Sequence, residues 1–274
     1  MIEFFELLEY DFFSNALIGI LIISVAAAII GTYIISRRMV SIAGGVTHAC
    51  FGGLGLGYFL GLNPIVMAMV FAVASSAGVE WLSARHRVRE DSAIAVVWAL
   101  GMAIGVLFVF MTPGYVPELN AFLFGNILTI TTADLWAFAI YTLILILFFS
   151  LCYDKIVMCA FDRDFARVTG MPVRFITYTM TVMVAVCIVL TIKLVGIMLL
   201  MSMLSLPQMT AEVFFHRFKG MMIASVAVSV ACSFVGLMIS ASIDVPCSAV
   251  IVLLMVVSFI IARLLKTAFR TFKK

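Results

Sequence analysis

The sequence predicts an all-α membrane protein, a polytopic bundle of about nine transmembrane helices, and three observations lead to this prediction. Hydrophobic residues make up 65% of the 274 positions and charged residues only 11%, whereas soluble domains are about half apolar and a quarter charged. Apolar runs of about 20 residues, the length that crosses a bilayer, recur along the chain. When these runs are counted as spans, the lysines and arginines gather on one side of the membrane.

The apolar runs and their boundaries give the expected order of the spans. We expect them at about 14–35, 46–60, 64–82, 92–111, 133–152, 175–194, 195–211, 220–240 and 247–265. Asn63 followed by Pro64 is a good helix-start signal for the third span. The apolar run 121–131 is too short to cross alone, which predicts an interfacial or re-entrant piece. Val195 and Gly196 leave almost no loop between the sixth and seventh spans, which predicts a tight hairpin.

The distribution of positive charge predicts the orientation. If the N-terminus lies outside, every lysine and arginine except Lys193 falls on the cytoplasmic side. The bias of Lys and Arg toward the cytoplasm sets membrane topology. An odd number of spans therefore predicts an external N-terminus and a cytoplasmic C-terminus, whereas an even number would break the sorting.

The second span contains His48 in a run of glycines, and the sequence places no other ionisable side chain at mid-depth. Such residues are costly in lipid and usually face a bundle interior or a wet cavity on a transport path. Small residues surround it on the helix: Gly44, Gly52 and Gly55 on the neighbouring face, and the stripe Ala49, Gly53, Gly57 and Gly61. The alternatives are structural, namely a neutral histidine that bridges two helices and a glycine stripe that serves packing alone.

The longest polar stretch, 153–174, predicts a short surface helix on the cytoplasmic side. Asp162 is a suitable N-cap, Phe165 and Val168 share one face, and Gly170 is a natural stop before a proline. A helix with exposed apolar residues at this point indicates a docking surface for another protein.

The motifs of the common enzyme classes do not occur in this sequence. It contains no P-loop, no HExxH, no GxSxG and no pair of intramembrane aspartates, and none of its six cysteines forms a CxxC pair. The sequence therefore predicts a transport component rather than an enzyme. Pro207 lies near the end of the seventh span, where we expect it to kink the helix and free a carbonyl.

The run SRRMVSIAGGVTHACFGGLGLG resembles the second-span signature of the permease subunits of zinc/manganese/iron-type bacterial ABC importers. The resemblance continues through EDSAIAVVWALGMAIGVLF, AFLFGNILTITTADL, FDRDFARVTGMP, VGIMLLMSMLSLPQMTA and DVPCSAVIVLL, so it covers nearly the whole chain in order. It implies one transmembrane permease domain, 1–274, in the bacterial cytoplasmic (inner) membrane. The partners that it implies are a second copy of the chain, a cytoplasmic ATPase subunit and an extracytoplasmic metal-binding protein. It implies no nucleic acid.

The resemblance also implies roles for particular residues. The loop at about 153–174 would be the coupling loop, and its helix would contact the ATPase through residues Asp162, Phe165, Ala166, Val168 and Gly170. His48 matches the pathway histidine of the family. A divalent metal ion is then the substrate, and no permanently bound cofactor is expected.

The sequence departs from the family pattern at one position of the metal site. The family usually has an aspartate four residues before the histidine, whereas this chain has Gly44. Imidazole suits zinc and carboxylate suits manganese, so the missing carboxylate favours zinc, while manganese and iron stay open. Two copies of His48 supply only two ligands, and Asp244, Cys50 and methionines are candidate substitutes.

Two alternatives to a metal-ion permease come from other classes. One is a permease for a metal chelate of the haem, siderophore or cobalamin kind, and the other is a facilitator or membrane-embedded enzyme that needs no ATP. A lone histidine in a narrow path favours a bare ion over a bulky ring.

Overall fold

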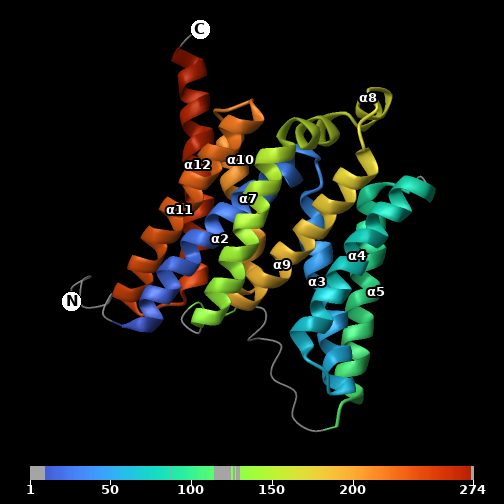
Figure 1. Cartoon of the computed structure of the whole chain (residues 1–274). Coiled ribbons are helices and arrows are strands. Elements are labelled where there is room, and N and C mark those ends of the chain that lie inside the picture. The colour runs from blue at the N-terminus through green and yellow to red at the C-terminus, as the bar shows by residue number, and fades with distance from the viewer. Residues whose placement is uncertain (1–9, 87, 114–124, 126, 128–129, 273–274) are drawn as a thin grey trace. The chain divides into compact units, whose positions relative to one another are not determined.

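The structure is a computed structural model that describes residues 10–86, 88–113, 125, 127 and 130–272. These residues are almost entirely helical, and no strand occurs among them (Figure 1). The helices are α2 (Asp11–Ser36), α3 (Val40–Leu60), α4 (Pro64–His86), α5 (Glu90–Met111), α7 (Thr132–Phe161), α8 (Arg163–Val168), α9 (Val173–Met203), α10 (Leu206–Glu212), α11 (Phe218–Ile243) and α12 (Cys247–Phe272). The predicted all-α fold class is confirmed.

Eight segments of the described chain are long and apolar enough to cross a membrane. One of them, Val173–Glu212, has 40 residues, about twice the length that a single crossing needs. Helix α9 leaves helical geometry inside this segment at Gly196, where φ is 79° and ψ is 173°. The break lies at the predicted boundary between the sixth and seventh spans. The other segments correspond to one predicted span each.

The chain divides into two compact units, and His48 lies in the second of them. Unit 1 consists of Met1–Ile35, Leu123–Leu147 and Leu194–Lys274, and unit 2 consists of Ser36–Phe122 and Phe148–Lys193. Helices α7 and α9 each contribute residues to both units.

In unit 1, the chain beyond Gly196 runs alongside α2. Gly125 lies against Gly196, and the carbonyl oxygen of Ile130 accepts a hydrogen bond from Asn15, near the start of α2. Further along, Gln208 Nε2 donates to the carbonyl oxygen of Ala27 at 3.0 Å, in the second half of α2. The segment between Gly196 and Gln208 therefore passes from one end of α2 toward the other, as a separate crossing does.

In unit 2, α3, α4 and α5 lie side by side (Figure 1). Gly53 of α3 faces α4 so closely that an added Cβ would lie 2.3 Å from the carbonyl oxygen of Met67. Gly55 faces α5, and a Cβ there would lie 2.4 Å from the carbonyl oxygen of Gly105. Small residues of this kind let helix backbones approach one another in membranes. The three helices are therefore held together through backbone contact.

The turn between α3 and α4 has the predicted capping residues. Gly61 ends α3 with a φ of 66°, in the left-handed region that glycine tolerates best. The Asn63 side chain then accepts hydrogen bonds from the backbone N–H groups of Ile65 and Val66, and Pro64 is the first residue of α4. The predicted start signal is confirmed.

One sequence-based boundary changes. Residues 153–161, which the sequence assigned to the coupling loop, form the last part of α7, after a break in helical geometry at Cys152. The change from apolar to polar residues after Cys152 therefore does not mark the end of this helix, which continues to Phe161. The predicted interfacial or re-entrant piece 121–131 lies largely outside the described residues.

Reporter fusions test the number of crossings. Nine crossings would place the two ends of the chain on opposite sides of the membrane, and the lysine and arginine distribution predicts a cytoplasmic C-terminus. We expect a phosphatase reporter fused before Ser14 to be active only outside, and a fluorescent reporter fused after Lys274 to be active inside. Reporters that place both ends on the same side would show that Val173–Glu212 crosses once.

Candidate functional site

Helix α3 presents His48 at a partly exposed position of unit 2, against α5. Its imidazole stacks on the indole of Trp98, with 4.6 Å between ring centroids and 4° between ring planes. The nitrogen lone pair that can bind a metal lies in the plane of a neutral imidazole, so an indole stacked on the ring face does not itself block it. The stack therefore restrains the plane of the ring without occupying the metal-binding edge.

The sequence alone does not single out Trp98, because its place beside His48 depends on the register between α3 and α5. In the structure, Gly52 contacts the backbone of Gly101 and Gly55 contacts that of Gly105. About one turn before Gly52 and Gly101, the same register brings His48 and Trp98 together.

The glycines around His48 divide between the two neighbouring helices. Gly52 and Gly55 contact the backbone of α5, whereas Gly53 and Gly57 contact α4, and the Phe71 side chain of α4 also lies against Gly52. The neighbouring helices fill the space beside these four residues. Gly44, which stands where the family's aspartate is expected, is buried.

Other metal ligands do not gather around His48. Among the described residues, no group of three or more His, Cys, Asp and Glu side chains could hold a metal ion. Cys50 is buried and its thiol donates to the carbonyl oxygen of Val46 at 3.0 Å. Asp244, in unit 1, is exposed and ends α11 with a φ of 58°. Within the part of the chain that the structure describes, one chain therefore does not supply a complete coordination shell at His48.

Pro207 lies at the start of α10 rather than inside a kinked helix, because α9 already ends at Met203. The residue four positions before the proline is Met203, whose carbonyl cannot receive a hydrogen bond from a proline nitrogen. The Gln208 side chain donates to that carbonyl instead, at 3.0 Å. The Gln208 side chain thus satisfies the carbonyl of Met203, which the proline was predicted to free. Pro207 lies in the first turn of α10 instead of kinking a longer helix.

The predicted short helix forms as α8 and ends in the predicted way. The Asp162 side chain accepts a hydrogen bond from the backbone of Phe165 at 2.8 Å. At the other end Gly170 has a φ of 76°, and the N–H of Met171 donates to the carbonyl of Ala166 at 3.1 Å. Ala166 is buried, whereas Phe165 is exposed and Val168 is 87% exposed. The helix thus presents two apolar side chains outward while its alanine packs inward.

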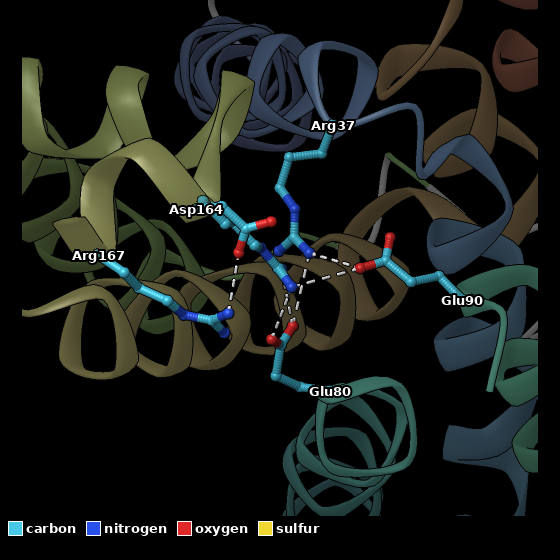
Figure 2. A network of polar contacts seen from close by, with 6 residues as sticks. Arg37, Glu80, Glu90, Asp164 and Arg167 are labelled. Atoms are coloured by element: carbon cyan, nitrogen blue, oxygen red, sulfur yellow. Dashed lines mark hydrogen bonds and ion pairs between the residues drawn. The ribbon is translucent and has the colours of Figure 1, made fainter. Parts of the chain in front are cut away.

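A cluster of four charged side chains connects α8 to the spans of unit 2 (Figure 2). Glu80 of α4 accepts from Arg163 through both carboxylate oxygens, each at 3.1 Å, and lies 3.5 Å from Arg37. Glu90 of α5 lies 3.0 Å from Arg37 and 3.5 Å from Arg163. The two carboxylates and two guanidinium groups balance in charge.

Burial makes this charged cluster important for stability. The side chains of Arg37 and Glu80 are only 6% and 7% exposed, and Glu80 lies within the apolar segment Pro64–Ser83. A charge removed from water needs a partner of opposite sign and further hydrogen bonds, which the bidentate contact with Arg163 supplies. Glu80 does not stand out in the sequence when charges are sought only at mid-depth. An acidic residue near the end of an apolar run, in a chain whose arginines are expected on one side of the membrane, was the available signal.

Comparison with known proteins identifies the family. The family model of the ABC 3 transport family matches residues 9–266. The chain belongs to the ABC 3 transport family. It is therefore a multi-pass membrane protein and the permease component of a transporter, not an enzyme.

Three relatives illustrate the ABC 3 family. A probable metal transport system membrane protein from Chlamydia pneumoniae is 35% identical over 85% of this chain and 81% of its own length. The manganese transport system membrane protein MntC from Listeria monocytogenes is 27% identical over 93% of this chain and 91% of its own. The structure of PsaBC from Streptococcus pneumoniae matches with a TM-score of 0.82 and 27% identity, covering 95% of this chain and 94% of that one.

Removal of Glu80 tests the charged cluster of this ABC 3 permease. In Glu80→Gln, Arg37 and Arg163 lose the carboxylate that contacts both of them, so we expect a loss of about 3 kcal/mol in unfolding free energy, as for other broken buried pairs. The measurement is thermal unfolding of the purified chain in detergent. The control is Asp164→Asn, whose side chain is 91% exposed and should change stability by less than about 1 kcal/mol. Equal melting temperatures for the two variants would contradict the role of the cluster.

Proposed function

We propose that this chain is the permease of an importer that carries a bare divalent transition-metal ion across the cytoplasmic membrane, driven by a separate ATPase subunit. The observation that carries the proposal is His48 on α3, with its ring plane fixed by Trp98. An ionisable side chain within a membrane span marks a transport path by default. Relatives named as metal transport and manganese transport membrane proteins support the class of substrate.

The ligand count supports a transient site shared by two copies. Each chain offers one imidazole, and no cluster of further ligands lies in the described part of the chain. A second copy would bring a second His48, and waters would complete the shell. A site that must release its ion needs fewer protein ligands than a structural site, which is closed by four.

The ligand chemistry favours zinc over manganese. Imidazole suits zinc and other borderline metals, and the position of the family's carboxylate is Gly44, which offers no side-chain oxygen. The name of the Listeria relative favours manganese instead. A metal chelate fits less well, because a single imidazole beside an indole contacts an ion better than a bulky ring.

Helix α8 is the proposed contact with the ATPase. Phe165 and Val168 expose an apolar pair on a helix that is capped at both ends. A short amphipathic helix of this kind inserts its apolar face into a groove of a partner. The charged cluster connects the same helix to α4 and α5. Because α4 and α5 pack against α3, a movement of α8 would displace the helices that surround His48.

Metal uptake by a His48 variant tests the pathway. In cells that depend on this importer, His48→Ala should reduce zinc uptake to about a tenth of the normal rate or less, because even indirect damage to a metal ligand costs 10- to 100-fold. Protein level and melting temperature should change little. The control is His216→Ala, which removes an exposed histidine outside the predicted path. Uptake that falls only in proportion to protein level would show that His48 merely bridges helices.

A carboxylate restored at position 44 tests the choice of metal. Gly44→Asp places oxygen ligands one helical turn from His48. We expect competition uptake to shift from zinc toward manganese. An unchanged preference in a variant that still transports would show that position 44 does not face the ion.

Disruption of the apolar face of α8 tests the coupling role. Val168→Asp should abolish ATP hydrolysis stimulated by the permease, while the permease keeps its melting temperature because the side chain is exposed. Arg217→Gln, an exposed residue outside α8, serves as the control and should keep stimulation. Normal complex formation and turnover in Val168→Asp would refute this assignment.

A further inference from the structure

A cavity of about 530 Å³ in unit 2 lies outside the proposed metal path. Its walls come from α4, α8 and α9, and the residues that matter are Glu80, Trp81, Arg163, Arg167, Arg174 and Tyr178. Three arginines and one glutamate thus line a space large enough for a small polar ligand.

Two of the three arginines are available to an anion. Arg163 is already engaged by Glu80 and Glu90 in the charged cluster. Arg167 contacts Asp164, whose side chain is 91% exposed and so is weakly held (Figure 2). Arg174 is exposed and makes no ion pair with any residue that the structure describes. Guanidinium groups match the oxygens of a phosphate through paired hydrogen bonds.

The cavity also opens onto apolar surface. Trp81 and Tyr178 are exposed aromatic residues on two of its walls, and such residues are enriched at the level of lipid headgroups. Trp81 lies two residues before the end of the apolar segment Pro64–Ser83. Val182, one turn beyond Tyr178 on α9, and Val70 of α4 are also exposed, which provides apolar surface for acyl chains.

We propose that this cavity binds the headgroup of an anionic phospholipid. Arg167 and Arg174 would hold the phosphate, Trp81 and Tyr178 would lie at the level of the glycerol, and the acyl chains would follow α4 and α9. Basic pockets between transmembrane helices are known to select acidic lipids in this way. A bound lipid would connect α8 to α4 and α9, and so would stabilise the position of the helix that we propose as the ATPase contact.

The geometry of α8 favours a lipid over the ATPase as the occupant. Arg163 and Arg167 are one helical turn apart and line the cavity. Phe165 and Val168 are exposed on a different face, since positions two and five residues after Arg163 lie far around the helix from it. The cavity and the apolar pair are therefore separate surfaces of one helix.

Lipid retention by the purified full chain tests the proposal. The chain would be incubated in mixed micelles with phosphatidylglycerol or phosphatidylcholine of the same acyl chains, and bound lipid would be measured by native mass spectrometry. We expect preference for phosphatidylglycerol, and about fivefold weaker binding for each arginine removed in Arg174→Gln and in Arg167→Gln/Arg174→Gln. Arg217→Gln removes an exposed arginine that does not line the cavity and should bind as the unaltered chain does.

Three results would overturn the proposal. The first is equal retention of the two lipids, or equal binding by all variants. The second is displacement of phosphatidylglycerol by inorganic phosphate at matched concentration, which would indicate a site for a free anion. The third is normal lipid binding by the Arg167 and Arg174 variants together with loss of their ATPase binding, which would make the cavity a protein contact. The lipid measurement involves neither metal nor ATP, so its failure would leave the proposed function untouched.

Discussion

Backbone contact between α3 and its two neighbours is the interaction on which the proposed site depends. Gly53 and Gly57 bring α3 against α4, and Gly52 and Gly55 bring it against α5. Because helices gain no hydrophobic driving force from one another in lipid, such close packing replaces it. The register that the glycines impose places His48 beside Trp98. A bulkier residue at any of these contacts would move the imidazole together with the helix that carries it.

The charged cluster of Arg37, Glu80, Glu90 and Arg163 connects α8 to the helices that pack on α3. Its carboxylates come from α4 and α5, the helices that pack on α3, and one of its arginines comes from α8. Breaking such a cluster exposes unpaired charge in an apolar environment, so its members are expected to move together. A displacement of α8 would therefore be transmitted to α3 through the charged cluster and the helices α4 and α5. The cavity beside Arg167 and Arg174 adds a place where the surrounding lipid can act on this connection.

The elements with strong local signals could be predicted from the sequence. One or two residues with distinctive backbone preferences determine each of three such elements: the helix start at Asn63, the capped helix α8 and the interruption of helical geometry at Gly196. The positions of Glu80 and Trp98 could not be read in the same way, because each depends on which helix lies beside it. The end of α7 was misplaced for a related reason: hydropathy reports where lipid ends, whereas the helix continues to Phe161.

The central claim is that His48 is a ligand of the transported metal, and X-ray absorption at the zinc edge tests it most directly. The full chain, purified and loaded with zinc, should show imidazole nitrogen at about 2.0–2.1 Å from the metal. That scattering should disappear in His48→Ala and persist in His216→Ala. A zinc spectrum that is the same in the unaltered chain and in His48→Ala would contradict the account.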